Sequence, residues 1–472
     1  MSLFDDSIQR LRARAAGFDT DLQRWLRRTA KQGDLPQHHT QVLRLSDYLS
    51  GMLEAIVQGT PVARATEPPF AGTVDDLPKL RRGVGSVHLV WDFFRDKLSQ
   101  RDTAAFTAHL GAADDLAWAC YQPFLNAATG SAAHGVSATE VREPPLVFYS
   151  TDRTPFAQAR TKTLHPPGLD AKDLQVFEAA LQQLPVPVIG MPWDIANRMP
   201  ETCLIGHEVG HVIAEDLRLV GEAATAIREA AFEKDAGGVR KKVWSAWRDE
   251  IFADVIGVLA TGSAFLESLT VELADARDEV RLEPINVEKP GRYPTRMLRV
   301  ALCRRFLDHV QTPAPAEWTE TYGQIEGPSK TYADDVPIVA AALMDRRWLA
   351  LGGRRLAEVL PWGAEREEQA RLVGSKRLRM QSAPVVFDVR TWVAASMHAY
   401  RENPATYRSR ELDQLLAEEI VGQRLVGTRS SIATRERLME RETTLGGPDI
   451  QRELRLVDRM AGADFARHLG LT

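Results

Sequence analysis

The chain has 472 residues, of which 44% are hydrophobic and 26% are charged, and its formal net charge is −5. This length predicts roughly two or three packed units with the composition of an ordinary globular protein. The slight acidity, without a dominant basic stretch, argues against a dedicated nucleic-acid binder, because such proteins gain affinity mainly by neutralising phosphates.

The cysteines and the apolar runs indicate the compartment. Cys120, Cys203 and Cys303 are far apart and form no CxxC pair, which argues against a disulfide framework and against a cysteine zinc site. The N-terminal segment lacks the apolar stretch of a secretory signal. No run approaches about 18 uncharged apolar residues, so no transmembrane helix is expected. We therefore expect a cytoplasmic protein that does not enter the membrane.

The first third of the chain is predicted to be helical. Apolar residues recur at helical spacing in residues 1–60 and again in 85–128. The stretch 60–82 is rich in proline and glycine and is predicted to be a connector. A second loop is expected at 129–145.

The middle of the chain changes character. Residues 146–150 (LVFYS) are apolar and aromatic and follow prolines, which is typical of a strand. A helix is predicted at 172–184. Residues 185–192 (PVPVIGMP) are β-branched but flanked by prolines that cannot donate to a ladder, which favours an edge strand over a central one. Pro200 suits the first turn of the helix that follows.

Nearly every segment after residue 200 is predicted to be helical. The expected helices are 200–219, 222–234, 243–261, 263–280, 296–310, 333–350, 388–400, 408–424, 430–441 and 449–468. The expected fold class is therefore α+β, predominantly α, with a small sheet beside the helix at 200–219. We divide the chain into an N-terminal helical region at 1–140, a core at 141–312 and a C-terminal helical region at 313–472.

One motif carries chemistry. His207, Glu208 and His211 form an HExxH pattern inside the apolar segment 201–217. Side chains at i and i+4 share one face of a helix, so the two imidazoles can converge on one Zn²⁺ while Glu208 reaches a water on it as general base. Chance would produce roughly 0.02 such matches in this chain. The alternative is a surface helix with two incidental histidines, but the apolar surroundings predict a buried helix.

A catalytic zinc needs a third protein ligand and an open position. Our preferred candidate is Glu250, in the apolar segment 243–262, with Asp254 one turn later to accept the free N–H of a ligating histidine. The alternative for both acids is a helix face in solvent. Glu215 and Asp249 are weaker candidates, because Glu215 lies a turn too far along its helix and Asp249 points about 100° away from Glu250.

The two motifs together resemble the gluzincin metallopeptidases, which carry HExxH on one helix and ExxxD on the next. The run from Glu250 to Asp254 is similar to the ExxAD signature of the M48 family, and the downstream Tyr293-Pro294 followed by Arg299 has the frame of that family's His-Pro and Arg. The similarity covers residues 186–300. It implies a zincin-like catalytic core flanked by helical regions, with the strand at 186–191 as the edge onto which a peptide substrate adds.

This resemblance suggests roles for three further residues. Tyr293 is the candidate second donor to the tetrahedral oxyanion, with a core or loop tyrosine as the alternative. Arg296 or Arg299 would orient substrate or pair with Asp254, and a solvated helix face is the alternative for either arginine. We expect a Zn²⁺-dependent metallopeptidase that acts on a protein or peptide substrate and is gated by its helical regions or an activating protein partner. The alternatives are a non-catalytic binding protein with a zincin fold and a zinc hydrolase of small amides.

Overall fold

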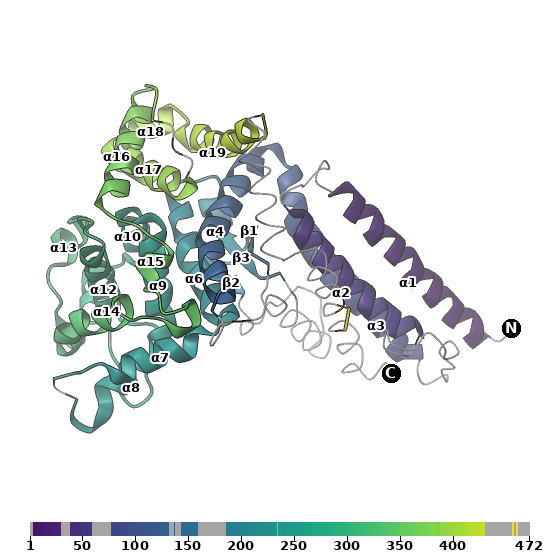
Figure 1. The fold of residues 1–472 in the computed structure, drawn as a ribbon, viewed down its shortest axis with the longest axis horizontal. Helices are drawn as coiled ribbons and strands as arrows, with labels where there is room; N and C mark the ends of the chain where they lie inside the picture. The colour runs from purple at the N-terminus through teal and green to yellow at the C-terminus, as the bar shows by residue number, and fades with distance from the viewer. Residues whose placement is uncertain are drawn as a thin grey trace.

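Figure 1 shows the computed structural model of the protein, which describes residues 3–29, 38–58, 77–131, 136, 143–158, 186–429 without 234, 385 and 387, and 456, 459 and 460. The described chain is mostly helical and has one three-stranded sheet, which confirms the predicted α+β class with a predominance of helix. The helices expected at 172–184 and 430–441, and nearly all of the one at 449–468, lie outside the described residues.

Three long helices form one end of the molecule: α1 (Leu3–Arg28), α2 (His39–Gln58) and α3 (Leu77–Ser99). They pack against one another around an apolar core of their own. Trp25 and Trp91 illustrate the contact between α1 and α3, with ring centroids 4.2 Å apart in an edge-to-face arrangement. The helical pattern predicted for residues 1–60 is confirmed where the structure describes it.

Helix α3 begins at Leu77, inside the stretch 60–82 that the sequence predicted as a connector. Leu80, Val84 and Val87 are buried at helical spacing in its first turns. Burial of this apolar face outweighs the low helix propensity of the interspersed glycines, so the helix starts earlier than expected.

The sheet consists of β1 (Leu146–Ser150), β2 (Phe156–Gln158) and β3 (Val188–Pro192) in the order β1-β3-β2. β3 pairs in parallel with β1 and antiparallel with β2. The prediction of an edge strand at 185–192 is therefore wrong, because this strand is central. Its prolines do not interrupt the ladder: Pro187 precedes the strand and accepts the Leu146 N–H at 2.9 Å through its carbonyl.

The two faces of the sheet belong to different cores. Leu146, Phe148 and Val188 point into the core of α1–α3. Val147 and Ile189, which alternate with them, belong to the larger core that also contains residues of α4 (Ala104–Thr129) and α6 (Ile205–Asp216). The sheet thus lies between the N-terminal helices and the rest of the molecule (Figure 1).

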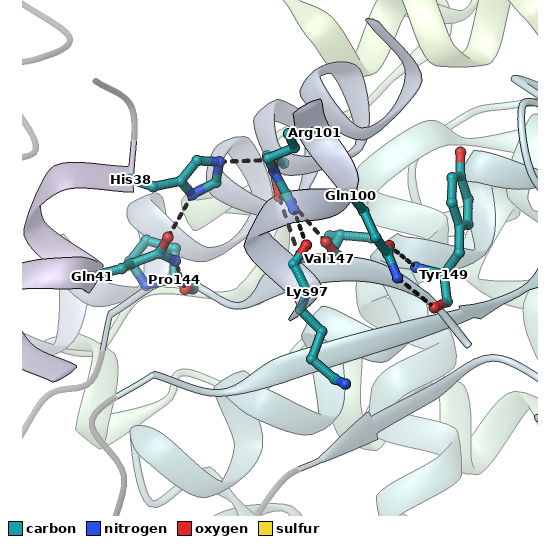
Figure 2. Close-up of polar contacts among 9 residues, drawn as sticks. His38, Gln41, Lys97, Gln100, Arg101, Pro144, Val147 and Tyr149 are labelled. Carbon is teal, nitrogen blue, oxygen red and sulfur yellow. Dashed lines mark hydrogen bonds and ion pairs between the residues drawn. The ribbon is translucent and has the colours of Figure 1, made fainter. Parts of the chain in front are cut away.

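Side chains cap the outer edge of β1 (Figure 2). The Gln100 amide accepts the Tyr149 N–H at 2.8 Å and donates to the Tyr149 carbonyl at 3.0 Å, as a neighbouring strand would. Arg101 donates to the Val147 carbonyl at 2.7 Å. These groups satisfy the outer edge of β1, and the strand order makes β2 the other edge of the sheet.

A buried polar network joins α4 to α2 and to the approach to β1 (Figure 2). Asp114 accepts three hydrogen bonds from Arg101, of 3.0, 2.7 and 2.8 Å, and His38 Nε2 lies 3.1 Å from its carboxylate. Burial would raise the pKa of Asp114, but Arg101 and His38 hold it well below its ordinary value. Gln41, which contacts His38 Nδ1 at 2.7 Å, donates to the Pro144 carbonyl at 2.7 Å. The network ties the N-terminal helices to the sheet.

The remaining elements are helices, and all of them except η3 follow the sheet in the chain. The 3-10 helices of the described residues are η3 (Gln100–Asp102), η4 (Trp193–Ile195), η5 (Glu201–Leu204), η6 (Ala236–Gly238), η7 (Gly327–Asp335) and η8 (Leu349–Leu351). The α-helices up to residue 309 are α7 (Leu219–Glu229), α8 (Val239–Ala246), α9 (Arg248–Thr261), α10 (Ser263–Leu273), α11 (Arg277–Arg281) and α12 (Arg296–His309). Beyond it lie α13 (Glu317–Tyr322), α14 (Val336–Met344), α15 (Leu356–Val359), α16 (Ala364–Leu378), α17 (Val389–Glu402), α18 (Pro404–Ser409) and α19 (Leu412–Arg429).

Most of these helices were expected, with shifted ends. The segment 243–261 is divided between α8 and α9, and α13, α15 and α16 have no predicted counterpart. Helix α16 is rich in charged residues, so its narrow apolar face is a weak signal in the sequence.

The larger core contains residues from Leu110 to Ile420, on both sides of the expected boundaries at 140 and 312. Helix α4 and the helices after residue 312 therefore pack into the same core as α6 and α9, whereas α1–α3 form the smaller core. No helix in the described part of the chain is long and apolar enough to cross a membrane.

Candidate metal centre

Helices α6 and α9 cross at close range because α6 carries glycines on the contact face. A Cβ at Gly210 would lie 2.7 Å from Ala253 Cα, and one at Gly206 would lie 2.7 Å from Ala260 Cβ. Real side chains essentially never approach so closely, so any larger residue would push the helices apart. The close crossing brings the buried Glu250 of α9 to the histidines of α6.

Three donor atoms converge between these helices. His207 Nε2 lies 3.2 Å from His211 Nε2, and Glu250 Oε2 lies 3.4 Å from the first and 3.6 Å from the second. Donors about 2.0–2.1 Å from a tetrahedral zinc lie about 3.3–3.4 Å from each other. The donor set and its spacing therefore fit a zinc ion. Among the residues described, this is the one His/Cys/Asp/Glu group of three or more with such spacing.

Asp254 contacts His207 on the side of the imidazole that faces away from the converging donors. Its Oδ1 lies 2.8 Å from His207 Nδ1, so the imidazole donates there. Nε2 of His207 then faces His211 and Glu250, with Arg299 Nη2 3.3 Å away. Arg299 of α12 donates to the same carboxylate through Nε at 2.7 Å and Nη2 at 2.8 Å. Burial would raise the pKa of Asp254, but the Arg299 cation lowers it. Asp254 is thus an ionised support for the first histidine.

The cluster favours positive charge between its carboxylates. Burial lowers the pKa of His207, but hydrogen bonds to Asp254 and Glu250 outweigh it and raise the pKa to about 9. Burial raises the pKa of Glu250, but His207 and His211 hold it well below its ordinary value. In the absence of a metal, a protonated His207 balances the negative charge of Glu250 and Asp254. A bound divalent cation would balance the same negative charge.

Glu208 lies beside this cluster and faces a cavity of about 270 Å³. It is 7% exposed, and the two histidines and Glu250 line the same cavity. The other lining residues are Thr154, Pro155, Leu204, Leu269, Glu272, Leu273, Tyr293 and Arg299. The cavity therefore brings the expected general base and the three expected ligands to one space that opens to solvent.

Tyr293 lines the cavity and is 52% exposed, so it stands at the mouth and not in the core. Partial burial and the charge of Glu250 raise its pKa, which keeps the phenol protonated as a donor. Arg299 also lines the cavity but is 8% exposed, which contradicts the alternative of a solvated helix face for this arginine.

Arg296 lies elsewhere. Its Nη1 is 3.1 Å from Asp275 Oδ2, and its N–H donates to Glu283 at 2.7 Å. It does not line the cavity, so the structure divides the two sequence candidates: Arg299 binds Asp254, and Arg296 pairs at the surface. Residues three apart lie on one face of a helix, so the two arginines differ in position because their acidic partners, Asp254 and Asp275, lie on different sides of α12.

The weaker ligand candidates do not join the cluster. Glu215 is absent from the group of converging donors, and the half-exposed Asp249 lies 3.3 Å from Arg248. Sequence reasoning missed Arg292, whose Nη2 lies 3.5 Å from Glu250 Oε1. Its position next to Tyr293 was the available signal.

Comparison of the chain with protein-family models, curated proteins and solved structures finds no match in any of the three. The chemistry of the site therefore has to be argued from its own geometry. Two imidazoles and one carboxylate form a three-ligand set that leaves a fourth position for water or substrate, and Glu208 supplies a separate carboxylate facing the same space.

Proposed function

We propose that this protein is a zinc-dependent metallopeptidase with a zincin-like core, in which His207, His211 and Glu250 hold the metal. The observation that carries the proposal is the spacing of the three donor atoms, which all lie within 4.8 Å of one another. The HExxH and ExxAD motifs, typical of gluzincins, supply these residues in the expected order. Zinc fits better than a harder cation because two of the three ligands are imidazoles.

The residues have distinct roles in this proposal. Bound zinc supplies a Lewis acid that polarises the scissile carbonyl and lowers the pKa of water. Glu208 takes the proton of the attacking water and delivers it to the leaving amine. The Tyr293 phenol donates to the oxygen that becomes negatively charged in the transition state. Asp254 holds His207 by a hydrogen bond, and Arg299 holds Asp254 in turn.

A polypeptide substrate is favoured over a small amide by the sheet beside the cavity. Thr154 and Pro155, which immediately precede β2, line the cavity wall. β3 is central and the edge of β1 is capped, so β2 takes the substrate-binding role that the resemblance implied for the strand at 186–191. An extended peptide that added to this edge would gain main-chain hydrogen bonds next to the metal ligands.

We extend the proposal to a cytoplasmic location and to control by the helical regions. All three cysteines are buried and free, as a reducing compartment would leave them. Helices α1–α3 cover one face of the sheet whose edge strand borders the cavity, so a protein partner bound there could alter the cleft.

The substitution Glu208→Gln tests the enzymatic role. The variant is expected to bind one equivalent of zinc and to lose more than about 100-fold in peptide hydrolysis, because an amide cannot accept the water proton. Glu320→Gln, which changes an exposed carboxylate on α13, is the matched control and should leave both properties unchanged. Full activity in Glu208→Gln would remove the assigned base, and zinc binding without hydrolysis in the wild-type protein would favour the non-catalytic alternative.

A further inference from the structure

One wall of the cavity is formed by helix α10. Leu269, Glu272 and Leu273 all line it, because residues at i, i+3 and i+4 share one face of a helix. Leu204 adds a further apolar side chain to the lining. The wall is thus an aliphatic surface that carries a single carboxylate.

Glu272 has no part in the proposed mechanism. No hydrogen bond or ion pair of its carboxylate is recorded among the residues that the structure describes. Of the other charged groups of the cavity, Arg299 binds Asp254, Glu250 contacts the histidines, and Glu208 is the proposed general base. Glu272 therefore presents an exposed negative charge at the side of the substrate space.

The surroundings of Glu272 are also negative. Partial burial raises its pKa, and the like charges of Asp194 and Glu201 raise it further. Of these two acids, Glu201 lies 3.9 Å from Arg198 Nε. A cation that arrived from the cavity side would relieve this repulsion and gain a charge-assisted hydrogen bond.

We propose that Glu272 makes this site selective for substrates that place a cationic group, a lysine or arginine side chain or a free terminal ammonium, against the leucine-lined wall of α10. The proposal rests on the proposed peptidase function, since it assigns the substrate class of the same cavity. Both parts of a lysine or arginine side chain suit this wall. The aliphatic stem packs on the leucines, and the charged end reaches the Glu272 carboxylate.

Peptide binding to the zinc-loaded Glu208→Gln protein tests the proposal without turnover. The probes are alanine-rich peptides that carry one lysine or one norleucine at successive positions, each with an acetylated or a free N-terminus. The lysine or free-amine peptide is expected to bind about tenfold more tightly than its neutral counterpart, as a charged hydrogen bond in a cavity allows. Adding Glu272→Gln should abolish this preference, Glu272→Lys should shift it towards a glutamate peptide, and Glu320→Gln should leave it unchanged.

The outcomes separate this inference from the proposed function. A preference that depends on the free N-terminus identifies the terminal ammonium as the cation, and one that survives acetylation identifies the side chain. Equal binding of charged and neutral peptides, or a preference that persists in Glu272→Gln, overturns the role of Glu272. Cleavage of the same peptides by the wild-type protein is scored separately. If the peptides are cleaved without a preference for a cationic group, the peptidase function stands and the role of Glu272 in selectivity is refuted. If cationic peptides bind preferentially but none is cleaved, the role of Glu272 stands and the peptidase function is refuted.

Discussion

Asp254 Oδ1 lies 2.8 Å from His207 Nδ1, and this contact links the two helices that build the centre. Arg299 holds the same carboxylate from a third helix, so α6, α9 and α12 meet at one buried charge network. The contact settles which imidazole nitrogen faces the converging donors, and it makes Asp254 a determinant of both metal affinity and stability.

Asp254→Asn is expected to weaken zinc binding by roughly 10–100-fold, the usual effect of removing a carboxylate that supports a histidine ligand. Unfolding should also become easier by about 3 kcal/mol, because the buried Arg299 loses its counter-charge. Chelator competition and urea unfolding measure the two effects. Asp275→Asn removes the more exposed partner of Arg296 and should leave both stability and zinc binding close to the wild type, because exposed ion pairs contribute little. Similar results for both variants would contradict the special place of Asp254.

Glu250→Ala is expected to lower zinc affinity by more than the roughly 10–100-fold typical of supporting residues, because it removes a ligand itself. Its neighbour Asp249 offers a matched control, since it is half-exposed and pairs with Arg248. Asp249→Ala should bind zinc like the wild type. Metal analysis after gel filtration is the measurement, and an unchanged zinc content in Glu250→Ala would refute the ligand assignment.

Gly210→Ala is expected to destabilise the protein by about 2 kcal/mol, because the added methyl group has no room against α9. The same displacement would move Glu250 away from the histidines, so zinc affinity should fall as well. Gly221→Ala is the control: no heavy atom lies within 4 Å of a Cβ at this position on α7, and the gain in helix propensity should stabilise the protein by about 0.5–1 kcal/mol. Thermal unfolding with and without zinc compares the two, and an unperturbed Gly210→Ala would show that the crossing tolerates a side chain.

A second buried carboxylate predicts acid sensitivity outside the metal centre. Glu367 on α16 accepts hydrogen bonds from the Ser263 hydroxyl and from Trp362 Nε1 at 3.0 Å, and His398 Nε2 lies 3.1 Å away. Burial would raise the pKa of Glu367, but these partners, His398 foremost, lower it from 4.5 to about 2. Its contribution of about 3 kcal/mol to folding is therefore complete above pH 4.5 and is lost as the pH falls towards 2.

Urea unfolding of the wild type and of Glu367→Gln at several pH values checks this contribution. The wild type should be more stable than the variant at pH 6, and the difference should shrink as the pH falls below about 4.5. The neighbouring Glu368 is exposed, so Glu368→Gln should change stability by less than about 0.5 kcal/mol at every pH. A difference between the wild type and Glu367→Gln that does not vary with pH would refute the depressed pKa.

Local patterns predicted the parts of the site that lie within single elements. The four-residue step from His207 to His211 places both imidazoles on one face of any helix, and the same step relates Glu250 to Asp254. The strand at 146–150 could also be predicted from local sequence, because a short apolar and aromatic run between turn signals has few other stable conformations. These predictions depend only on backbone geometry and burial, which a short stretch of sequence determines.

Contacts between distant segments were decided by the tertiary structure alone. β3 is central because β1 and β2, both earlier in the chain, pair with its two edges, and no feature of residues 185–192 encodes those partners. Arg299 turns inward and Arg296 outward because Asp254 and Asp275 lie on other elements. Glu272 reaches the cavity for the same reason. Such placements depend on how elements distant in the sequence pack together. The free energy of that packing comes from the whole core, so no local sequence pattern determines it.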